Sequence, residues 1–235
     1  MPYYWLYYFA PLALAFAEKN PAVALVALVF VAARPWLPDP VILMKVLSRL
    51  GSLKHQAELN PANIVVRRDL ALAYLDLRRP RTALRYLDEA LKRDPKNQEL
   101  SYLRGLALFR AGDAEQAVRA FAASLGVDPD SAEPLSSHSA PGNAGTFRRH
   151  GEALLATGLA LEELGRFEQA EEALKASATY NSSTLEPLVR LARVRRRKGD
   201  MEGSDAAGRE ARTTFRQLPG FMKRRQLGWW LRSWV

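Results

Sequence analysis

The sequence predicts an all-α protein: an α-solenoid of about four stacked helix pairs, with an apolar segment before it and an amphipathic helix after it. Three observations support this fold class. Prolines recur every 34 residues, at Pro61, Pro95 and Pro129, and small and apolar residues recur in register with them. Few glycines or prolines interrupt the repeats, so each unit can hold two helices. A period of this length is typical of stacked helix pairs.

The first two units align residue by residue. A shift of 34 positions carries Ala71 onto Gly105 and Ala83 onto Ala117. In the first unit the two alanines lie on two apolar helical faces, separated by a predicted break at residues 78–80. Small residues on both faces let the two helices approach closely, and neighbouring pairs must then stack to bury their apolar sides.

A third and a fourth unit follow with less regular spacing. A step of 53 positions carries Gly105 and Ala117 onto Gly158 and Ala170, so about 19 residues are inserted before the third unit. A further step of 34 places Ser204 at the position of Ala170, and a glycine at the position of a leucine. Because glycine inside a helix costs about 1 kcal/mol relative to alanine, the fourth unit is predicted to be degraded.

This pattern resembles the tetratricopeptide repeat (TPR) family over roughly residues 61–215. The third unit departs from the family by ending at Asn181-Ser182 instead of proline, and Arg104 stands where a leucine is usual. The resemblance implies a protein-binding scaffold and leaves the partner open. The residues that carry it are Leu70, Ala71, Tyr74, Ala83, Leu87, Ala90 and Pro95, then Gly105, Gly112, Ala117, Phe121 and Pro129, then Gly158, Leu161, Gly165, Ala170 and Leu174.

The resemblance also implies a concave groove lined by the first helix of each pair. Its apolar patches and basic end favour an acidic or amphipathic peptide as ligand. The candidate groove residues are Arg68, Leu72, Asp76, Tyr102, Leu106, Phe109, Arg110, Leu155, Leu159, Glu162, Val189, Arg193, Arg196 and Arg197.

The repeats lie between segments of different character. We expect a hydrophobic membrane anchor at 1–37, an amphipathic capping helix at 38–60, TPR units one and two at 61–129, a flexible loop at 130–146, units three and four at 147–216, and a basic Trp-rich tail helix at 217–235.

The N-terminal segment holds two apolar stretches, residues 3–17 and 21–33, separated by Glu18, Lys19 and Asn20. Each stretch would span only about 20 Å of a hydrocarbon core about 30 Å thick. Three interpretations remain: a short membrane hairpin, one crossing that buries the polar trio, or a soluble element that covers the first repeat. The cost of burying Glu18 and Lys19 favours the hairpin. The aromatic residues expected at a membrane interface are Tyr3, Trp5, Trp36, Trp229, Trp230 and Trp234.

Positive charge after the apolar segment predicts its orientation. Arg34, Lys45, Arg49 and Lys54 follow it, and basic residues beside a membrane segment tend to stay in the cytoplasm. We therefore expect a membrane protein, of the bacterial inner membrane, with cytoplasmic repeats.

Most of the net charge of +9 lies at the C-terminal end. From residue 185 onward 13 Lys and Arg face 5 acids, whereas residues 1–184 carry 21 against 20. Such density favours an acidic partner, either a protein or peptide or a lipid surface; no motif for reading nucleic acid accompanies it. The tail helix either caps the last repeat or lies in a membrane interface, and one helix could do both.

Residues that could support catalysis are sparse. The chain has no cysteine, and its three histidines share no ligand spacing. Glu162, Glu163, Glu171 and Glu172 are predicted at solvent-facing helical positions. We therefore expect no cofactor, no metal site and no enzymatic activity, and predict a membrane-tethered scaffold or adaptor that binds a protein or peptide partner. The alternatives are an assembly or maturation factor for a membrane or cell-envelope complex, and an envelope protein with periplasmic repeats.

Overall fold

The computed structural model describes residues 40–127 and 148–234, together with Asn20, Ala22 and Leu25. The predicted loop at 130–146 lies outside these residues, as does nearly all of the predicted membrane anchor at 1–37. Across the described ranges, no helix is both long enough and apolar enough to cross a bilayer.

The described residues form helices joined by short turns and contain no strand. The helices are α3 (Pro40–Leu59), α4 (Ile64–Asp76), α5 (Pro80–Leu91), α6 (Gln98–Arg110), α7 (Ala114–Leu125), α8 (His150–Glu163), α9 (Phe167–Tyr180), α10 (Glu186–Arg197), α11 (Met201–Gln217) and α12 (Gly220–Arg232).

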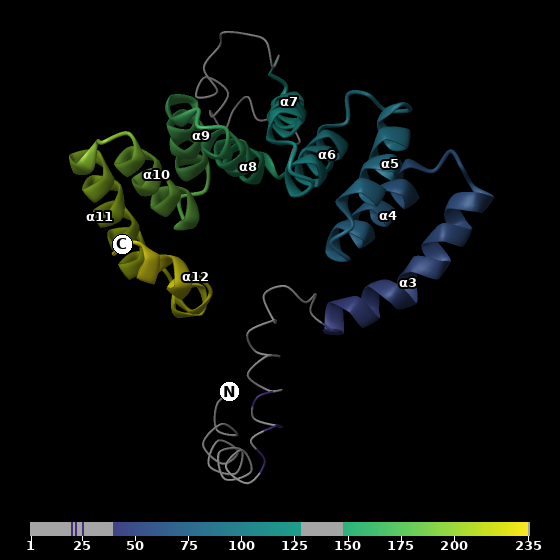
Figure 1. Ribbon diagram of the computed structural model, residues 1–235, viewed down its shortest axis with the longest axis horizontal. Helices are drawn as coiled ribbons and strands as arrows, with labels where there is room; N and C mark the ends of the chain where they lie inside the picture. The colour runs from purple at the N-terminus through teal and green to yellow at the C-terminus, as the bar shows by residue number, and fades with distance from the viewer. Residues whose placement is uncertain (1–19, 21, 23–24, 26–39, 128–147, 235) are drawn as a thin grey trace.

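Four helix pairs stack into an arch. The pairs α4/α5, α6/α7, α8/α9 and α10/α11 are antiparallel hairpins, and each pair packs on the next. Figure 1 shows α4, α6, α8 and α10 on the inner side of the arch, with their partners on the outer side. The helices α3 and α12 lie at its two ends (Figure 1). The prediction of an all-α solenoid of four helix pairs is confirmed.

The turn inside each pair requires a left-handed backbone. Gly112, Gly165 and Gly199 adopt φ angles of 89°, 73° and 86° at equivalent places in units two to four. In the first unit Arg78 occupies this place with φ 56°. Glycine enters the left-handed region without steric cost, so these glycines set the spacing of the two helices.

Small residues bring the helices of a pair together, as the sequence predicts. A Cβ atom added at Gly105 would lie 2.5 Å from the ring of Phe121, and one at Gly158 would lie 2.8 Å from Cγ of Leu174. The glycine on one helix thus accommodates the large side chain of its partner. Phe121 and Leu174 are fully buried.

The two end helices pack on the stack through apolar side chains. Leu50, Leu53 and Ala57 of α3 lie against the core of the first units. At the other end the ring of Trp230 in α12 stacks on Phe215 of α11, with the centroids 5.2 Å apart. Trp229 packs against the small core cluster of α10 and α11.

The glycine that the sequence marks as a defect of the fourth unit has a structural role. A Cβ atom at Gly208 would lie 3.2 Å from the carbonyl oxygen of Ser233 and 3.3 Å from Nη1 of Arg212. The end of α12 therefore approaches α11 at the place where a larger side chain would crowd it.

Candidate functional site

The inner surface of the arch changes character along the stack. Leu72, Leu106 and Leu159 occupy equivalent positions on α4, α6 and α8, and each is half-buried. The equivalent residue of α10 is Arg193, which is exposed. Together with Phe109 and Leu155, also half-buried, the three leucines form an apolar row along the inner helices.

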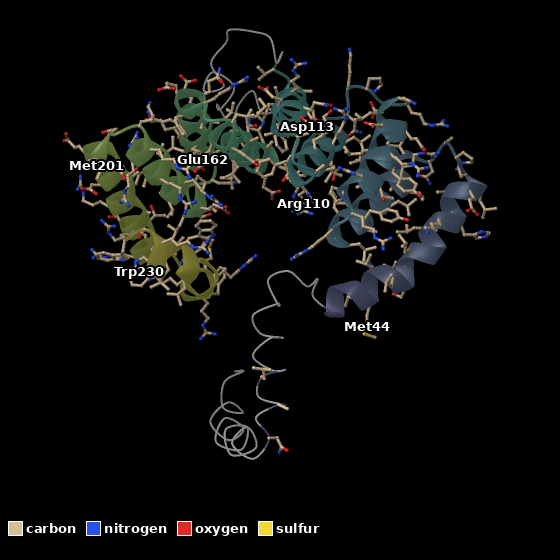
Figure 2. The ribbon with its side chains drawn as sticks, in the orientation of Figure 1. Met44, Arg110, Asp113, Glu162, Met201 and Trp230 are labelled. Atoms are coloured by element: carbon tan, nitrogen blue, oxygen red, sulfur yellow. The ribbon has the colours of Figure 1, made fainter. Side chains whose placement is uncertain are left out.

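The polar candidates near this row are mostly held by neighbours. Arg110 extends from the inner side of α6 (Figure 2) and donates to the carbonyl oxygen of Leu75 at 3.1 Å. Arg68 forms ion pairs with Asp69 at 2.9 Å and Glu99 at 3.3 Å. Hydrogen bonding to Asp69 raises the pKa of Arg68, against a smaller opposing effect of burial. Asp76 is exposed.

Two predicted groove residues present little surface to a ligand. Tyr102 is 5% exposed, and its hydroxyl donates to a carboxylate oxygen of Glu152 at 3.2 Å. Burial, helped by the charge of Glu152, raises the pKa of Tyr102. Val189 is 4% exposed and belongs to the core of the fourth unit. Both side chains are therefore part of the packed interior beneath the inner surface of the arch and are not available for direct contact with a ligand.

Glu162 is not solvent-facing, contrary to the expectation from sequence. It is 8% exposed, and its carboxylate pairs with Nη1 of Arg197 at 3.3 Å. This ion pair connects α8 to α10, which are the inner helices of two successive units (Figure 1). It also compensates the charge of Arg197 in the groove.

Glu171 departs from the same expectation. Its side chain is 13% exposed and pairs with Lys175 at 2.8 Å, Arg195 at 3.0 Å and Lys198 at 2.8 Å. Partial burial alone would raise its pKa, but hydrogen bonds from Lys175, Lys198 and Arg195 lower the pKa of Glu171 to about 2. This carboxylate ties α9 to α10 and compensates part of the basic charge of the fourth unit.

Arg193 and Arg196 differ from Arg197, because no carboxylate compensates their charge among the described residues. Both are exposed, and within the described part of the chain neither forms an ion pair. They open into a pocket of about 340 Å³ between α10, α11 and the end of α12, which we call the end pocket. Its polar and aromatic lining comes from Arg193, Arg196, Ser204, Asp205, Arg212, Arg232, Ser233 and Trp234.

Charge is balanced in a second hollow, of about 570 Å³, between α3 and α4 at the other end of the arch. Lys45 and Arg49 of α3 line one side, and Asp69 and Asp76 of α4 line the other. Opposite charges therefore compensate each other in this hollow, in contrast to the end pocket.

The aromatic residues of the tail divide between two environments. Trp229 and Trp230 are half-buried against α10 and α11, whereas Trp234 is 64% exposed. The tail helix thus caps the last repeat and also presents aromatic surface to solvent. Tyr3, Trp5 and Trp36 lie outside the described residues.

Groups that could support metal chemistry do not gather in the described ranges. No three His, Cys, Asp or Glu side chains there are placed to hold a metal ion. The buried His150 packs against the ring of Tyr180 at 5.1 Å.

The stacked helical hairpins, arranged in an arch, define the class of helical-repeat proteins whose extended inner surfaces serve as binding surfaces. A model of the tetratricopeptide repeat family matches residues 68–133, 144–184 and 155–219, which together cover more than half of the sequence. The chain belongs to the tetratricopeptide repeat family. A search of curated proteins found no significant match.

Solved structures of TPR proteins share this fold. A crystal structure of MamA superposes with a TM-score of 0.62 at 16% identity, covering 74% of this chain and 84% of MamA. MamA from Desulfovibrio magneticus RS-1, from residue 41 to its end, gives 0.62 at 16%, covering 74% and 88%. YrrB, described as a TPR protein with an unusual peptide-binding site, gives 0.57 at 13%, covering 77% and 82%. At these identities the likeness shows the fold alone.

Sequence reasoning missed several residues of the end pocket. Arg212 and Arg232 lie on α11 and α12, outside the first helices to which the family resemblance directs attention. Ser204 carried a usable signal, because alanine occupies its position in the other units, at Ala83, Ala117 and Ala170.

Proposed function

We propose that this protein is a membrane-tethered adaptor that holds a peptide segment of a partner protein in its concave groove, at the cytoplasmic face of a bacterial inner membrane. The TPR fold supports a partner-binding role. The groove indicates the chemistry of the partner, and the sequence before α3 supports the tether.

The observation that carries the proposal is the change from leucine to arginine along one inner position. Leu72, Leu106 and Leu159 leave apolar surface exposed, and Arg193 continues their line with an uncompensated charge. An amphipathic segment could lay its apolar side chains on the leucines and place carboxylates near Arg193. Charge complementarity of this kind raises the association rate and fixes the direction in which the peptide lies.

The apolar row suits a binding surface better than it suits a core. Leu72, Leu106, Phe109 and Leu155 pack against the core, and all five side chains of the row remain partly exposed, so a partner can still bury the remaining surface. Burial of apolar area contributes about 25 cal/mol per Å², which makes a groove of half-exposed leucines a source of affinity.

Capture of partners by the full-length chain tests the groove. Leu159→Glu places a charge in the apolar row, and Val65→Glu places the same charge at an exposed apolar site at the start of α4. We expect Leu159→Glu to abolish capture and Val65→Glu to retain it, measured by cross-linking and mass spectrometry in membranes. Equal capture by both variants would remove the groove from the proposal.

Reporter fusions test the tether separately. A reporter after residue 60 is expected in the cytoplasm, and one after residue 20 distinguishes the hairpin from a single crossing. Deletion of residues 1–40 is expected to remove the stable anchoring, so that the truncated protein is washed from membranes at high salt while the full-length protein is retained. A reporter at residue 60 on the outer side would overturn the orientation without touching the groove.

A further inference from the structure

The end pocket concentrates positive charge. Arg193 and Arg196 of α10 carry no ion pair among the described residues, as stated above. Nη1 of Arg212 donates to the neutral carbonyl of Ser233 at 2.6 Å, and its guanidinium lies 4.5 Å from the ring centroid of Trp234. Arg232 lies over the ring of Trp229 at 4.8 Å. Four arginines thus line the pocket, against one lining carboxylate, Asp205; Arg232 also interacts electrostatically with Glu186 outside the lining, whereas no carboxylate pairs with Arg193, Arg196 or Arg212 among the described residues.

A buried hydroxyl in the same pocket lacks a partner. Ser204 is 2% exposed, and its Oγ makes no hydrogen bond with the described residues. Buried hydroxyls are nearly always paired, and leaving one unpaired is costly, so Ser204 calls for an explanation. Ser204 belongs to the pocket lining, but its Oγ has less than 1 Å² of accessible surface, so an anion in the pocket would accept this hydrogen bond after a small shift of the side chain.

An exposed apolar stripe leads to the pocket. Leu227 and Leu231 lie four residues apart on one face of α12, and Trp234 follows just beyond the end of the helix; they are 48%, 57% and 64% exposed. Trp230 lies at the edge of the same face, where its ring stacks on Phe215 of α11 and lies 6.2 Å from the ring of Trp234. The stripe ends at Trp234, which itself lines the pocket. The exposed apolar side chains therefore reach the arginine-lined end pocket.

We infer that the end pocket binds the phosphate of an anionic phospholipid headgroup, while Leu227, Leu231 and Trp234 contact the apolar part of the same lipid. The inference rests on the proposed membrane association and assigns a second lipid contact to the C-terminal end. The volume of about 340 Å³ lies within the range of small-molecule sites, about 300–1,000 Å³. Arginine binds phosphate through paired N–H donors, and tryptophan and leucine suit the membrane interface.

Binding of soluble short-chain lipids by the full-length chain in neutral detergent tests the inference. The probes are dihexanoyl phosphatidylglycerol, dihexanoyl phosphatidylcholine and inorganic phosphate, each followed by tryptophan fluorescence. We expect the anionic lipid to bind more tightly than the zwitterionic one, and inorganic phosphate to bind weakly and compete with it.

Matched variants separate the pocket from diffuse charge. Arg193→Ala with Arg196→Ala removes two pocket charges, and Arg209→Ala with Arg216→Ala removes two exposed charges of α11 outside it. We expect the pocket pair to weaken anionic-lipid binding about tenfold or more and the control pair less than about twofold, because a charged hydrogen bond contributes far more than a screened surface charge. Ser204→Ala, which changes no charge, should weaken binding about fivefold by the loss of one hydrogen bond.

The stripe is tested by Leu231→Ser, which should weaken lipid binding and leave phosphate binding unchanged. If the two double-arginine variants lost the same amount of affinity for the anionic lipid, the end pocket would not be the lipid-binding site. Inorganic phosphate that binds as tightly as the lipid would make this a site for free phosphate. A dimer that Leu231→Ser dissociates, without any effect of lipid, would assign the stripe to a second copy of the chain. Leu159→Glu should leave lipid binding intact, so failure of the groove and failure of the pocket give different results.

Discussion

Ser204→Ala should stabilise the protein when no ligand is bound. The hydroxyl is buried and unpaired, and an unpaired buried polar group costs about 1–3 kcal/mol. Alanine keeps the Cβ atom, leaves no large cavity and has a higher helix propensity by up to about 0.7 kcal/mol. We expect the free energy of unfolding to rise by about 2 kcal/mol. For a chain of this size that corresponds to an increase in Tm of roughly 4–8 °C.

The matched control is Ser177→Ala, one unit earlier. Ser177 is equally buried, at 1% exposure, but its Oγ donates to the carbonyl oxygen of Gly151 at 2.9 Å. Removing a satisfied hydroxyl should destabilise the protein by about 1 kcal/mol. Thermal unfolding followed by circular dichroism, in the absence of lipid and phosphate, measures both variants under the same conditions.

The test depends on opposite changes in the free energy of unfolding: an increase for Ser204→Ala and a decrease for Ser177→Ala. If Ser204→Ala destabilised the protein as much as Ser177→Ala, the hydroxyl of Ser204 would be satisfied in solution, and its value as evidence for an anion would be lost. A further check comes from added anionic lipid. It should stabilise the unmodified protein more than the Ser204→Ala variant, since ligand binding raises stability according to affinity.

Three other outcomes follow from contacts in the stack. Gly105→Ala should destabilise the protein by about 1–3 kcal/mol in urea unfolding, because a methyl group would overlap the ring of Phe121, whereas Gly228→Ala, with open space around it, should be neutral or stabilising. Glu171→Gln should cost about 1–2 kcal/mol at pH 7 after allowance for solvent screening; because folding lowers the pKa of Glu171 to about 2, this difference should hold above pH 4.5 and fade as the pH falls toward 2 in acid titrations. Trp230→Ala should speed amide hydrogen exchange in α12 and leave exchange in α6 unchanged, because the ring of Trp230 holds α12 on α11.

The stack could be predicted because its determinants are local and repeated. A small residue on one helix and a large one on its partner recur at fixed spacing, as in Gly105 with Phe121 and Gly158 with Leu174. The turn glycines Gly112, Gly165 and Gly199 add a backbone requirement at the same interval. Steric constraints of this kind can be recognised in a single sequence, because every unit packs its two helices in the same way and therefore repeats the same residue sizes at the same positions.

The state of individual charged side chains could not be predicted in this way. Glu162 and Glu171 lie at helical positions that look exposed when each helix is considered alone. Partners from α10 then cover them, namely Arg197 for the first and Arg195 with Lys198 for the second. The burial of a carboxylate depends on which helix stacks next and where its long side chains reach, and helical periodicity does not contain that information.

The fourth unit shows how a broken pattern can be informative. Compared with the earlier units, Ser204 and Gly208 look like losses of core packing. In the structure Gly208 makes room for the carbonyl of Ser233, and Ser204 is buried beside the end pocket, at the position where the other units have alanine. Both substitutions follow from the last position in the stack, where the next partner is α12 and not another repeat. The same unit places four arginines in the lining of the end pocket, so the departures from the repeat pattern at Ser204 and Gly208 coincide with a change in the chemistry of the surface.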